Sequence, residues 1–416
     1  MTDQPVSPLA GDFVARPTEV LAGYRESCPV AKVVAPNGRA RWLITREEDV
    51  RAAFLDPRLS LRSEPRDPGR PHRALDMSLV NYDPPDHTRI RRLAAPAFAP
   101  GRIAGYRERV AAAAGDLLEA LGEPERFELM AEFAEPFSFH VLCEVLAVPG
   151  GDRAALHAAV RVLVNQRRHD AAALESAVDH LDAFVRTEIA ARLGGAGQDV
   201  FSTVVRAWEA AEGSVTEAEL VDLLAMLLLA GFDSTVQMLG MCVLALLGED
   251  GPTARLAAEP GLLARALDEL LRWDTPGPFS TTRVALEEVR IGGSVIPAGG
   301  RVLLAVAAAN RDPRCHPDPD RLDLERPDAA RHLTFGLGPH YCLGAALARL
   351  ELTEALGALL TRWPGLQLDG PADGLSWSGG HQHRRLDALP LRPGPPGAGR
   401  TRNGRTGNGR TVGVSR

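Results

Sequence analysis

The sequence is poor in lysine: Lys32 is its one lysine, and arginine supplies the rest of its 47 basic residues. The 54 acidic residues outnumber the basic ones, which leaves a formal net charge of −7 and a pI near 5.9. Proteins that bind a phosphate backbone present a basic face to it. This charge balance therefore excludes generalised nucleic-acid binding, and we expect no nucleic-acid partner.

Cysteine is also scarce. The five cysteines are Cys28, Cys143, Cys242, Cys315 and Cys342, and no two of them have the C-x-x-C spacing of a zinc or dithiol site. An odd number of widely separated cysteines gives no sign of a disulfide framework. A reducing cytoplasm is therefore the expected location of this protein.

Long apolar runs are absent. Residues 1–14 contain acidic residues and prolines without an apolar segment, so neither a signal peptide nor an N-terminal anchor is predicted. The longest apolar stretch, near residues 223–230, is shorter than the roughly 20 residues that a membrane-spanning helix needs. We therefore expect no membrane partner.

The chain nevertheless has enough apolar residues, 45% of 416, to bury a sizeable core. Strand-like segments flank the turn signal at residues 36–38 and recur at 289–304, while residues 87–273 carry apolar residues at helical spacing. We expect a mainly α fold with small β-sheets, formed by a single domain over residues 1–392. Residues 393–416 are rich in Gly and Arg and contain no acid, so this tail is predicted to be disordered.

One segment points to a specific chemistry. It reads Phe335-Gly336-Leu337-Gly338-Pro339-His340-Tyr341-Cys342-Leu343-Gly344-Ala345. Glycine has no Cβ, so a loop of this composition can bring its backbone close to a flat cofactor. A helix is predicted to start at Ala345, and its first N–H groups would stabilise Cys342 as the thiolate, which is the form that ligates iron.

The pattern Phe-Gly-x-Gly-x-His-x-Cys-x-Gly resembles the haem-binding signature of the cytochrome P450 family. The resemblance extends over roughly residues 20–390 and implies a triangular, mostly helical prism that holds haem b. It implies that Cys342 is the iron ligand, with Phe335, Gly336 and Gly344 around the cofactor. The dominance of arginine looks like the coding bias of a high-GC genome, which fits the soluble actinobacterial members.

A second segment, Ala230-Gly231-Phe232-Asp233-Ser234-Thr235, lies in an apolar helix that is predicted to begin at the capping box Ser214-x-x-Glu217. A glycine followed by side chains that compete for backbone hydrogen bonds should distort this turn. The segment resembles the family's oxygen-binding groove, where an acid and an alcohol relay protons. This resemblance implies catalytic roles for Ala230, Gly231, Asp233 and Ser234. The family commonly has threonine where this chain has Ser234, whose hydroxyl is less restricted.

Four further residues resemble the family's ligands for the two haem propionates. His87 and Arg91 fall at i, i+4 on one face of a predicted helix. Arg283 and His340 occupy the matching positions later in the chain. Such partners are needed because an unpaired buried charge is costly.

A structural motif also resembles the family. Glu269 and Arg272 are spaced i, i+3 on a predicted helix over residues 262–273. Together with Arg321 they resemble the family's Glu-Arg-Arg triad, whose role is in folding rather than in chemistry.

The resemblance implies a monooxygenase, because an axial thiolate on haem favours O–O cleavage. It would insert one atom of dioxygen into a small apolar organic substrate, by hydroxylation or epoxidation. Pro278, Phe279 and Trp377 suggest an apolar pocket for a secondary metabolite such as a macrolide, terpenoid, polyketide or peptide. The segments expected to determine the substrate are residues 62–78, 160–182, 276–281 and 377–381.

Electrons must come from outside the chain, which has no Gly-x-Gly-x-x-Gly nucleotide signature. The resemblance therefore implies a separate ferredoxin and ferredoxin reductase. An acidic carrier is expected to dock near Cys342 on Arg89, Arg92 and Arg349. We expect the enzyme to be a monomer.

Three alternatives differ from this interpretation. The same fold can perform oxidative coupling or cyclisation, which the sequence does not separate from hydroxylation. Peroxide-driven oxygenation would replace the acid and alcohol, and a non-catalytic haem sensor or carrier would not need the groove. Residues 230–235 therefore argue against the last two.

Overall fold

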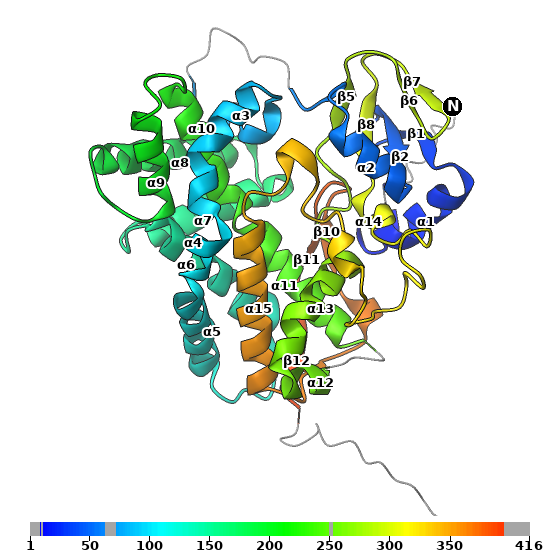
Figure 1. Cartoon of the computed structure of the whole chain (residues 1–416). Coiled ribbons are helices and arrows are strands. Elements are labelled where there is room, and N and C mark those ends of the chain that lie inside the picture. The colour runs from blue at the N-terminus through cyan, green and yellow to red at the C-terminus, as the bar shows by residue number, and fades with distance from the viewer. Residues whose placement is uncertain (1–8, 10, 63–71, 249–252, 395–416) are drawn as a thin grey trace, which may run out of the picture.

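The computed structural model describes residues 9, 11–62, 72–248 and 253–394, and helices make up most of it (Figure 1). In Figure 1 the helices form the left and lower parts, and the larger sheet lies at the upper right, so that the outline is triangular. The expected mainly α fold with small sheets is confirmed. The predicted disordered tail lies, from residue 395 onward, outside the described residues.

The α-helices carry most of the chain. In chain order they are α1 (Pro17–Ser27), α2 (Glu47–Leu55), α3 (Asp86–Ala94), α4 (Pro100–Ala104), α5 (Arg107–Leu121), α6 (Glu135–Leu146), α7 (Arg153–Val164), α8 (Ala171–Arg192), α9 (Val200–Glu209), α10 (Glu217–Ala230), α11 (Asp233–Leu246), α12 (Thr253–Ala258), α13 (Pro260–Trp273), α14 (Val306–Ala309) and α15 (Ala345–Arg362).

The strands are short and form separate small sheets. They are β1 (Val30–Val34), β2 (Ala40–Ile44), β3 (Leu59–Ser60), β4 (Phe127–Glu128), β5 (Arg283–Ala285), β6 (Val289–Ile291), β7 (Ser294–Ile296), β8 (Arg301–Leu304), β9 (Gln367–Leu368), β10 (Trp377–Gly379), β11 (Arg384–Leu386) and β12 (Pro390–Arg392). The largest sheet has the order β1-β2-β8-β5-β3, and the others are β4-β12-β9, β6-β7 and β10-β11.

The five-stranded sheet joins segments that are far apart in the sequence. β1 and β2 form the predicted hairpin, with Val30 opposite Ile44, and Gly38 takes the positive φ of 76° that its turn requires. β8 pairs with β2 in parallel and with β5 in antiparallel orientation. This arrangement places Arg283, the first residue of β5, opposite Val302.

The helical core places two functional segments opposite each other. α11 packs against α6, α13 and α15. The cysteine-containing loop ends where α15 begins, and Cys342 of this loop lines the same cavity as Ser234 at the start of α11. Most of the large apolar side chains of these helices belong to one continuous buried cluster.

The apolar helix that contains the predicted groove is broken. α10 ends at Ala230 and α11 begins at Asp233, which confirms the predicted distortion around Gly231. The carbonyl oxygen of Ala230 accepts a hydrogen bond from Ser234 Oγ at 3.0 Å, and that of Phe232 accepts one from Ser138 Oγ at 3.2 Å. A Cβ on Gly231 would lie 2.8 Å from the side chain of Leu142, so glycine also lets α6 approach.

The predicted start of this helix was two residues too early. The capping box is formed by Thr216 and Glu219 rather than by Ser214 and Glu217. The carbonyl oxygen of Val215, a buried residue, accepts a hydrogen bond from Trp208 Nε1 at 2.8 Å. That contact holds residue 215 outside the helix, so the cap falls on the next residue.

The predicted Glu-Arg-Arg triad is correct in two members and wrong in the third. Arg272 donates two hydrogen bonds to the fully buried Glu269, at 2.6 and 2.8 Å. Arg326, not Arg321, completes the network, because its Nε lies 3.1 Å from both carboxylate oxygens. Arg321 has a side chain that is 70% exposed, and it pairs with Asp323.

Residues 217–246, which include α10 and α11, are long and apolar enough to cross a membrane by length and composition. However, 72% of the most apolar window is buried inside the molecule, as in the core helix of a folded domain. The sequence estimate of the apolar stretch was too short because it ended at the break near Gly231.

Candidate active site

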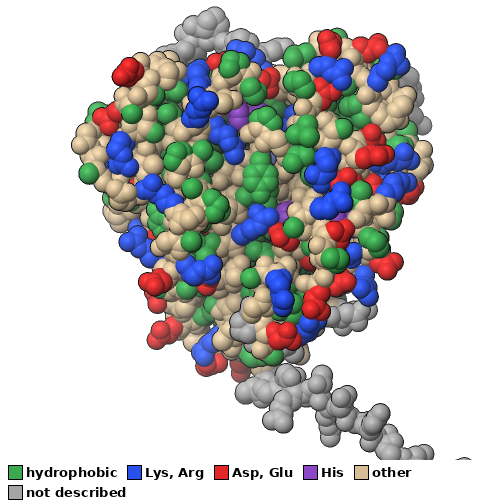
Figure 2. Space-filling view, viewed as in Figure 1, with side chains coloured by type: hydrophobic (Ala, Val, Ile, Leu, Met, Phe, Trp, Pro, Cys, Tyr) green, Lys and Arg blue, Asp and Glu red, His purple; other side chains and the backbone are tan. Residues whose placement is uncertain are grey.

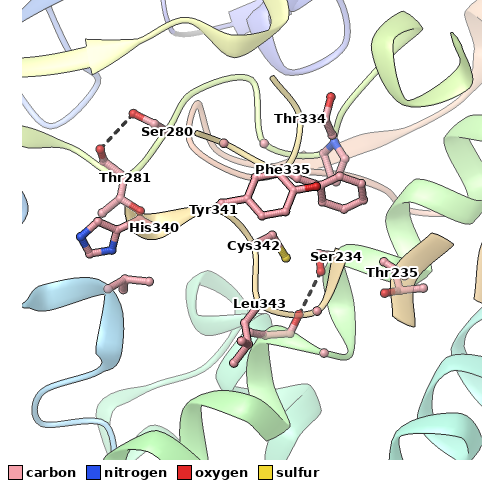
Figure 3. A pocket seen from close by; sticks show the side chains of 18 of the residues that line it. Ser234, Thr235, Ser280, Thr281, Thr334, Phe335, His340, Tyr341, Cys342 and Leu343 are labelled. Atoms are coloured by element: carbon pink, nitrogen blue, oxygen red, sulfur yellow. Dashed lines mark hydrogen bonds between the residues drawn. The ribbon is translucent and has the colours of Figure 1, made fainter. Parts of the chain in front are cut away.

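A cavity of about 430 Å³ lies between the break in the α10–α11 helix and the loop that precedes α15. Cys342 lines it from the loop, and Ala230, Gly231 and Ser234 line it from the helix. Figure 3 shows the side chains of Cys342 and Ser234 in the same space, with the hydrogen bond from Ser234 to the Ala230 carbonyl drawn as a dashed line. The structure therefore brings together the two segments that the sequence singled out.

The loop around Cys342 is closed by backbone contacts. The N–H of Cys342 donates to the carbonyl of Phe335 at 2.9 Å, and Gly336 between them has a φ of 72°. Cys342 is accessible because it lines the cavity. Burial nevertheless raises the pKa of its thiol, while the Gly344 N–H and then Arg91 and Arg349 act in the opposite direction. The predicted preference for the thiolate is therefore opposed by desolvation; a metal that coordinates a thiol overcomes this, because it deprotonates the thiol outright.

The four predicted propionate ligands all line the cavity. The rings of His87 and His340 lie 4.0 Å apart between centroids. Burial, followed by the charge of Arg91, lowers the pKa of His87 to about 4, and burial with His87 and Arg283 lowers that of His340 to about 4. Burial also lowers the pKa of Arg283 to about 10. Among the described residues, Asp83 is the one carboxylate whose charge raises the pKa values of His87, Arg283 and His340. The cluster therefore has more cationic or imidazole groups than acids.

Unsatisfied polar atoms in this cluster test whether haem fits. Both ring nitrogens of His87 and Nε of Arg283 are buried without a hydrogen-bond partner in the described structure. Buried polar groups are normally paired, so these atoms indicate an acceptor-rich anionic group at this end of the cavity. Arg91 donates to the Tyr341 carbonyl at 2.6 Å, which holds its guanidinium beside the cysteine loop. Two propionate carboxylates match this arrangement of donors.

The remaining cavity wall suits a flat apolar ring. Gly344 lines the cavity, and a Cβ added to it would meet no atom within 4 Å, so its backbone offers open space to a cofactor. Phe335 lines the same wall and is covered on its other side by Arg349, whose Cζ lies 4.6 Å from the ring centroid. The aliphatic lining residues are mainly Leu61, Leu79, Val80, Leu142, Val145, Leu146, Met226, Leu227, Met238, Leu271, Val306, Leu333, Leu343, Leu347 and Leu352.

Asp233 does not line the cavity, in contrast to its predicted partner Ser234. Its buried carboxylate is hydrogen-bonded to His383, just before β11, and forms an ion pair with Arg385 in β11. Ser234 instead donates to the Ala230 carbonyl. The acid and the alcohol are thus neighbours in the chain that face different surroundings.

Two titratable residues of the cavity, Glu351 and His383, were not predicted from the sequence. Glu351 is fully buried on α15, lines the cavity and has Oε2 without a hydrogen-bond partner. Burial raises the pKa of its carboxyl well above the usual value, although the nearby Ser138 hydroxyl acts in the opposite direction. His383 lines the cavity near Asp233. Glu351 occurs at an apolar position of a core helix, which was an available signal; His383 had none.

Of the segments predicted to determine the substrate, one lines the cavity in part. Pro276, Gly277, Phe279, Ser280 and Thr281 line the cavity. Trp377, Pro278 and residues 160–182 are not part of its wall, and the ring of Trp377 is covered by Arg384 at 4.0 Å. Residues 63–71 of the first segment lie outside the described residues.

The three arginines expected to bind a redox partner have different surroundings. Arg89 is engaged by Glu219, with one contact at 2.8 Å, and by Asp86. Arg349 donates to Asp268 at 2.9 Å. Arg92 is exposed on α3 and has no ion pair within the described residues. Figure 2 shows acidic and basic side chains intermixed over the face it displays, without a continuous basic surface there.

Comparison with known proteins identifies relatives over nearly the whole chain. The family model "Cytochrome P450" matches residues 156–366. The cytochrome P450 monooxygenase PikC of Streptomyces venezuelae is 37% identical over 388 residues, which cover 92% of each protein. The structure of the bacillaene polyketide synthase cytochrome P450 PksS of Bacillus subtilis 168 has a TM-score of 0.86 at 30% identity and covers 93% of this chain and 99% of its own.

A further structure is that of CxnD, a cytochrome P450 enzyme for C–S bond formation in chuangxinmycin biosynthesis. It has a TM-score of 0.82 at 32% identity, and the match covers 91% of this chain and 94% of CxnD. Family match, relatives and fold agree with the resemblance that the cysteine segment indicated. The chain therefore belongs to the cytochrome P450 family, and it is a monooxygenase that carries haem b.

Proposed function

We propose that this enzyme inserts one atom of dioxygen into a C–H or C=C bond of an apolar natural product, with a polyketide or macrolide as the preferred class. The observation that carries this proposal is the single cavity shared by Cys342, the four cationic or imidazole side chains and Ser234. The wall beyond these residues is largely apolar, which favours a hydrophobic substrate. Ser280 and Thr281 add hydroxyl groups that can orient it.

In this proposal the loop side of the cavity holds the cofactor. Cys342 ligates the iron, and His87, Arg91, Arg283 and His340 bind the propionates. The buried, unsatisfied nitrogens of His87 and Arg283 support this role. Phe335, Gly336 and Gly344 shape the loop so that its backbone lies against the ring. When bound, haem with a thiolate ligand supplies the O–O cleavage and the oxygen atom that is inserted.

In this proposal the residues at the break between α10 and α11 deliver protons. The missing Cβ of Gly231 and the turn after Ala230 leave room at the cavity wall, and Ser234 directs its hydroxyl there. Asp233, next to Ser234 in the chain, is the acid of the proposed proton relay. The apolar residues around it exclude bulk water from the reacting bond.

Carbon monoxide binding tests the cofactor assignment. The purified protein, reduced with dithionite, should show the strongly red-shifted Soret band of a thiolate-ligated haem. Cys342→Ala should lose this band, whereas Cys28→Ala, which changes an exposed cysteine, should retain it. A normal band in Cys342→Ala would reject Cys342 as the ligand.

Substrate binding can then be screened in the intact enzyme. Polyketide macrolactones and apolar peptides are titrated into the ferric protein, and a shift of the haem spin state reports binding in the cavity. Turnover with a bacterial ferredoxin, its reductase and NADPH should yield a product heavier by one oxygen atom. Binding restricted to peptides would overturn the preferred substrate class.

Relatives such as CxnD favour a second function. CxnD forms a C–S bond on the same fold at 32% identity. Oxidative coupling or cyclisation would give a product that has lost two hydrogen atoms and gained no oxygen. Mass spectrometry of products made under ¹⁸O₂ separates this outcome from hydroxylation or epoxidation.

The enzyme also needs a source of electrons. We infer that a separate ferredoxin and its reductase deliver the electrons, that the enzyme acts as a cytoplasmic monomer, and that residues 1–392 form one domain. Arg92, which is exposed and has no ion pair in the part of the chain that the structure describes, supports docking of an acidic carrier beside α3. Sedimentation with and without ferredoxin tests both the oligomeric state and the partner.

A further inference from the structure

The carboxylate of Asp233 is held by two side chains of the β10–β11 hairpin. Nε2 of His383 lies 2.6 Å from Asp233 Oδ2, and Arg385 pairs with Oδ1. One turn further along α11, Gln237 Oε1 accepts a hydrogen bond from the N–H of Leu386 at 2.7 Å, which ties β11 to the helix. The carboxylate therefore faces the hairpin, while Ser234 faces the cavity.

One of these two partners can give up a proton and the other cannot. A guanidinium stays protonated in proteins, so Arg385 can stabilise the charge of Asp233 but cannot replace a proton that leaves it. Histidine exchanges protons readily near neutral pH. Of the two side chains hydrogen-bonded to Asp233, His383 is thus the one that can return a proton to it.

Exposure places His383 between solvent and Asp233. The side chain of His383 is 39% exposed, whereas that of Asp233 is 7% exposed. His383 also lines the cavity, so its ring lies at the boundary between solvent, the cavity and the buried carboxylate. Bulk water can therefore reach the His383 ring directly, and the ring is hydrogen-bonded to Asp233.

The other titratable groups near this pair are already engaged. Glu135 on α6 lies near Arg385, and its pKa is lowered mainly by its contact with His157, with Arg161 and Arg385 contributing. His157 and Arg161 on α7 lie 3.2 and 3.0 Å from the Glu135 carboxylate. This acid therefore has its own partners and leaves the contact between His383 and Asp233 intact.

We propose that His383 carries protons from solvent to Asp233, and that Arg385 keeps the carboxylate in position to receive them. In each transfer the His383 imidazolium loses its Nε2 proton to Asp233 Oδ2, the protonated Asp233 side chain turns from the hairpin and releases a proton toward Ser234, and His383 recovers a proton from water. No electron moves in this step. Insertion of one oxygen atom with formation of one water consumes two protons, and the redox partner supplies the two electrons. The inference rests on the proposed monooxygenase function.

Replacement of the histidine tests the transfer. His383→Gln keeps an N–H donor for Asp233 but cannot exchange a proton. With ferredoxin, reductase and NADPH, the fraction of electrons recovered in product should fall about tenfold, and the solvent deuterium isotope effect should rise. KM should change much less than this coupling, because His383 forms one small part of the cavity wall and glutamine has a similar size. His140→Gln, which changes an exposed histidine on α6, should behave like the unmodified enzyme.

Hydrogen peroxide separates a failure of this inference from a failure of the proposed function. Peroxide supplies oxygen, electrons and protons together, so His383→Gln should keep its peroxide-supported product yield. Unchanged coupling with NADPH, or an equal loss in both assays, would overturn the role of His383. If the unmodified enzyme oxidises no substrate under either condition, the proposed function itself is rejected.

A spectroscopic measurement on the folded protein does not depend on turnover. In ¹⁵N-histidine-labelled protein, as the diamagnetic carbon monoxide complex, the ring nitrogens of His383 should show a hydrogen bond to a carboxylate. Asp233→Asn should shift these signals and leave those of His140 in place. Signals of His383 that are unaffected by Asp233→Asn would contradict the contact on which the proposal rests.

Discussion

Ser234 is held by its own backbone rather than by Asp233. Its hydroxyl donates to the Ala230 carbonyl, which the break between α10 and α11 leaves without its usual helical partner. The hydroxyl therefore has a defined position at the cavity wall despite the missing β-branch of threonine. This contact compensates for the rotational freedom that serine has relative to threonine.

Removal of this hydroxyl should uncouple electron use from product formation. In Ser234→Ala, haem content and the carbon monoxide spectrum should stay normal, while product per NADPH falls about tenfold. Ser234→Thr should retain coupling, because threonine can form the same bond to the Ala230 carbonyl. If Ser234→Ala couples as well as the unmodified enzyme, a substrate hydroxyl or an ordered water delivers the protons instead.

Glu351 carries a stability cost that depends on pH. Burial raises the pKa of its carboxyl in the folded state well above that in the unfolded state. The folded protein thus holds a proton that the unfolded chain releases above about pH 4.3, so stability falls as pH rises past this value. Glu351→Gln should stabilise the protein at pH 8 by on the order of 1–3 kcal/mol and remove this part of the pH dependence.

Thermal unfolding at pH 6 and pH 8 checks this expectation. The melting temperature of the unmodified protein should drop more between the two pH values than that of Glu351→Gln. Glu354→Gln on the same helix is the matched control, because Glu354 is paired with Arg107 near the surface. Equal pH dependence of Glu351→Gln and the unmodified protein would show that Glu351 is ionised when folded.

At the scale of elements, a buried ion network joins α13 to the segment before the cysteine loop. Besides Glu269, Arg272 donates to the carbonyls of Asn310 and Pro319, and Arg326 donates to those of Pro317, Asp318 and Arg321. The carboxylate of Glu269 and the guanidinium groups of Arg272 and Arg326 all have hydrogen-bond partners, so the segment before the cysteine loop is fixed against α13. This network sets the position from which the chain reaches Phe335.

The two arginines near this segment should differ sharply in their effect on stability. Arg326→Ala leaves Glu269 buried with one partner fewer and should cost about 3–5 kcal/mol of unfolding free energy. Arg321→Ala removes an exposed pair with Asp323 and should change stability by less than about 0.5 kcal/mol. Chemical denaturation measures both values. A larger loss in Arg321→Ala than in Arg326→Ala would restore the original triad assignment.

At the scale of the whole molecule, electron transfer depends on which charges remain free at the surface. Arg89 and Arg349 are tied to acids of the chain, whereas Arg92 is exposed without such a partner in the described structure. A docking site for an acidic carrier therefore depends on Arg92 more than on its two neighbours.

Charge reversal at this position should slow reduction by ferredoxin. Arg92→Glu should lower the second-order rate of haem reduction up to about tenfold at low salt, and the difference should shrink as salt screens the charges. Arg290→Glu, which makes the same charge change on β6, should have no such effect. Stopped-flow reduction at several ionic strengths checks this, and an unchanged rate in Arg92→Glu would exclude Arg92 from the interface.

Local patterns were sufficient for much of this protein. The glycines and cysteine around Cys342, the helical spacing of His87 and Arg91, and the Asn37-Gly38 turn depend on nearest-neighbour geometry, and the structure places them as predicted. The break at Gly231 was likewise predictable from backbone preference. Family and cofactor followed from the cysteine segment alone, because few arrangements of these residue types serve another purpose.

Contacts between distant segments were decided by the tertiary structure. Arg326 rather than Arg321 reaches Glu269 because the chain turns between them. The two arginines are five positions apart and chemically identical, so the sequence alone could not distinguish them. Asp233 turns to His383 and Arg385, some 150 residues away, because β11 packs beside α11. Burial of Glu351 likewise depends on which helices surround it. Residue types and spacing therefore determined the cofactor chemistry of this chain, whereas packing decided which charges meet and which of them can exchange protons with solvent.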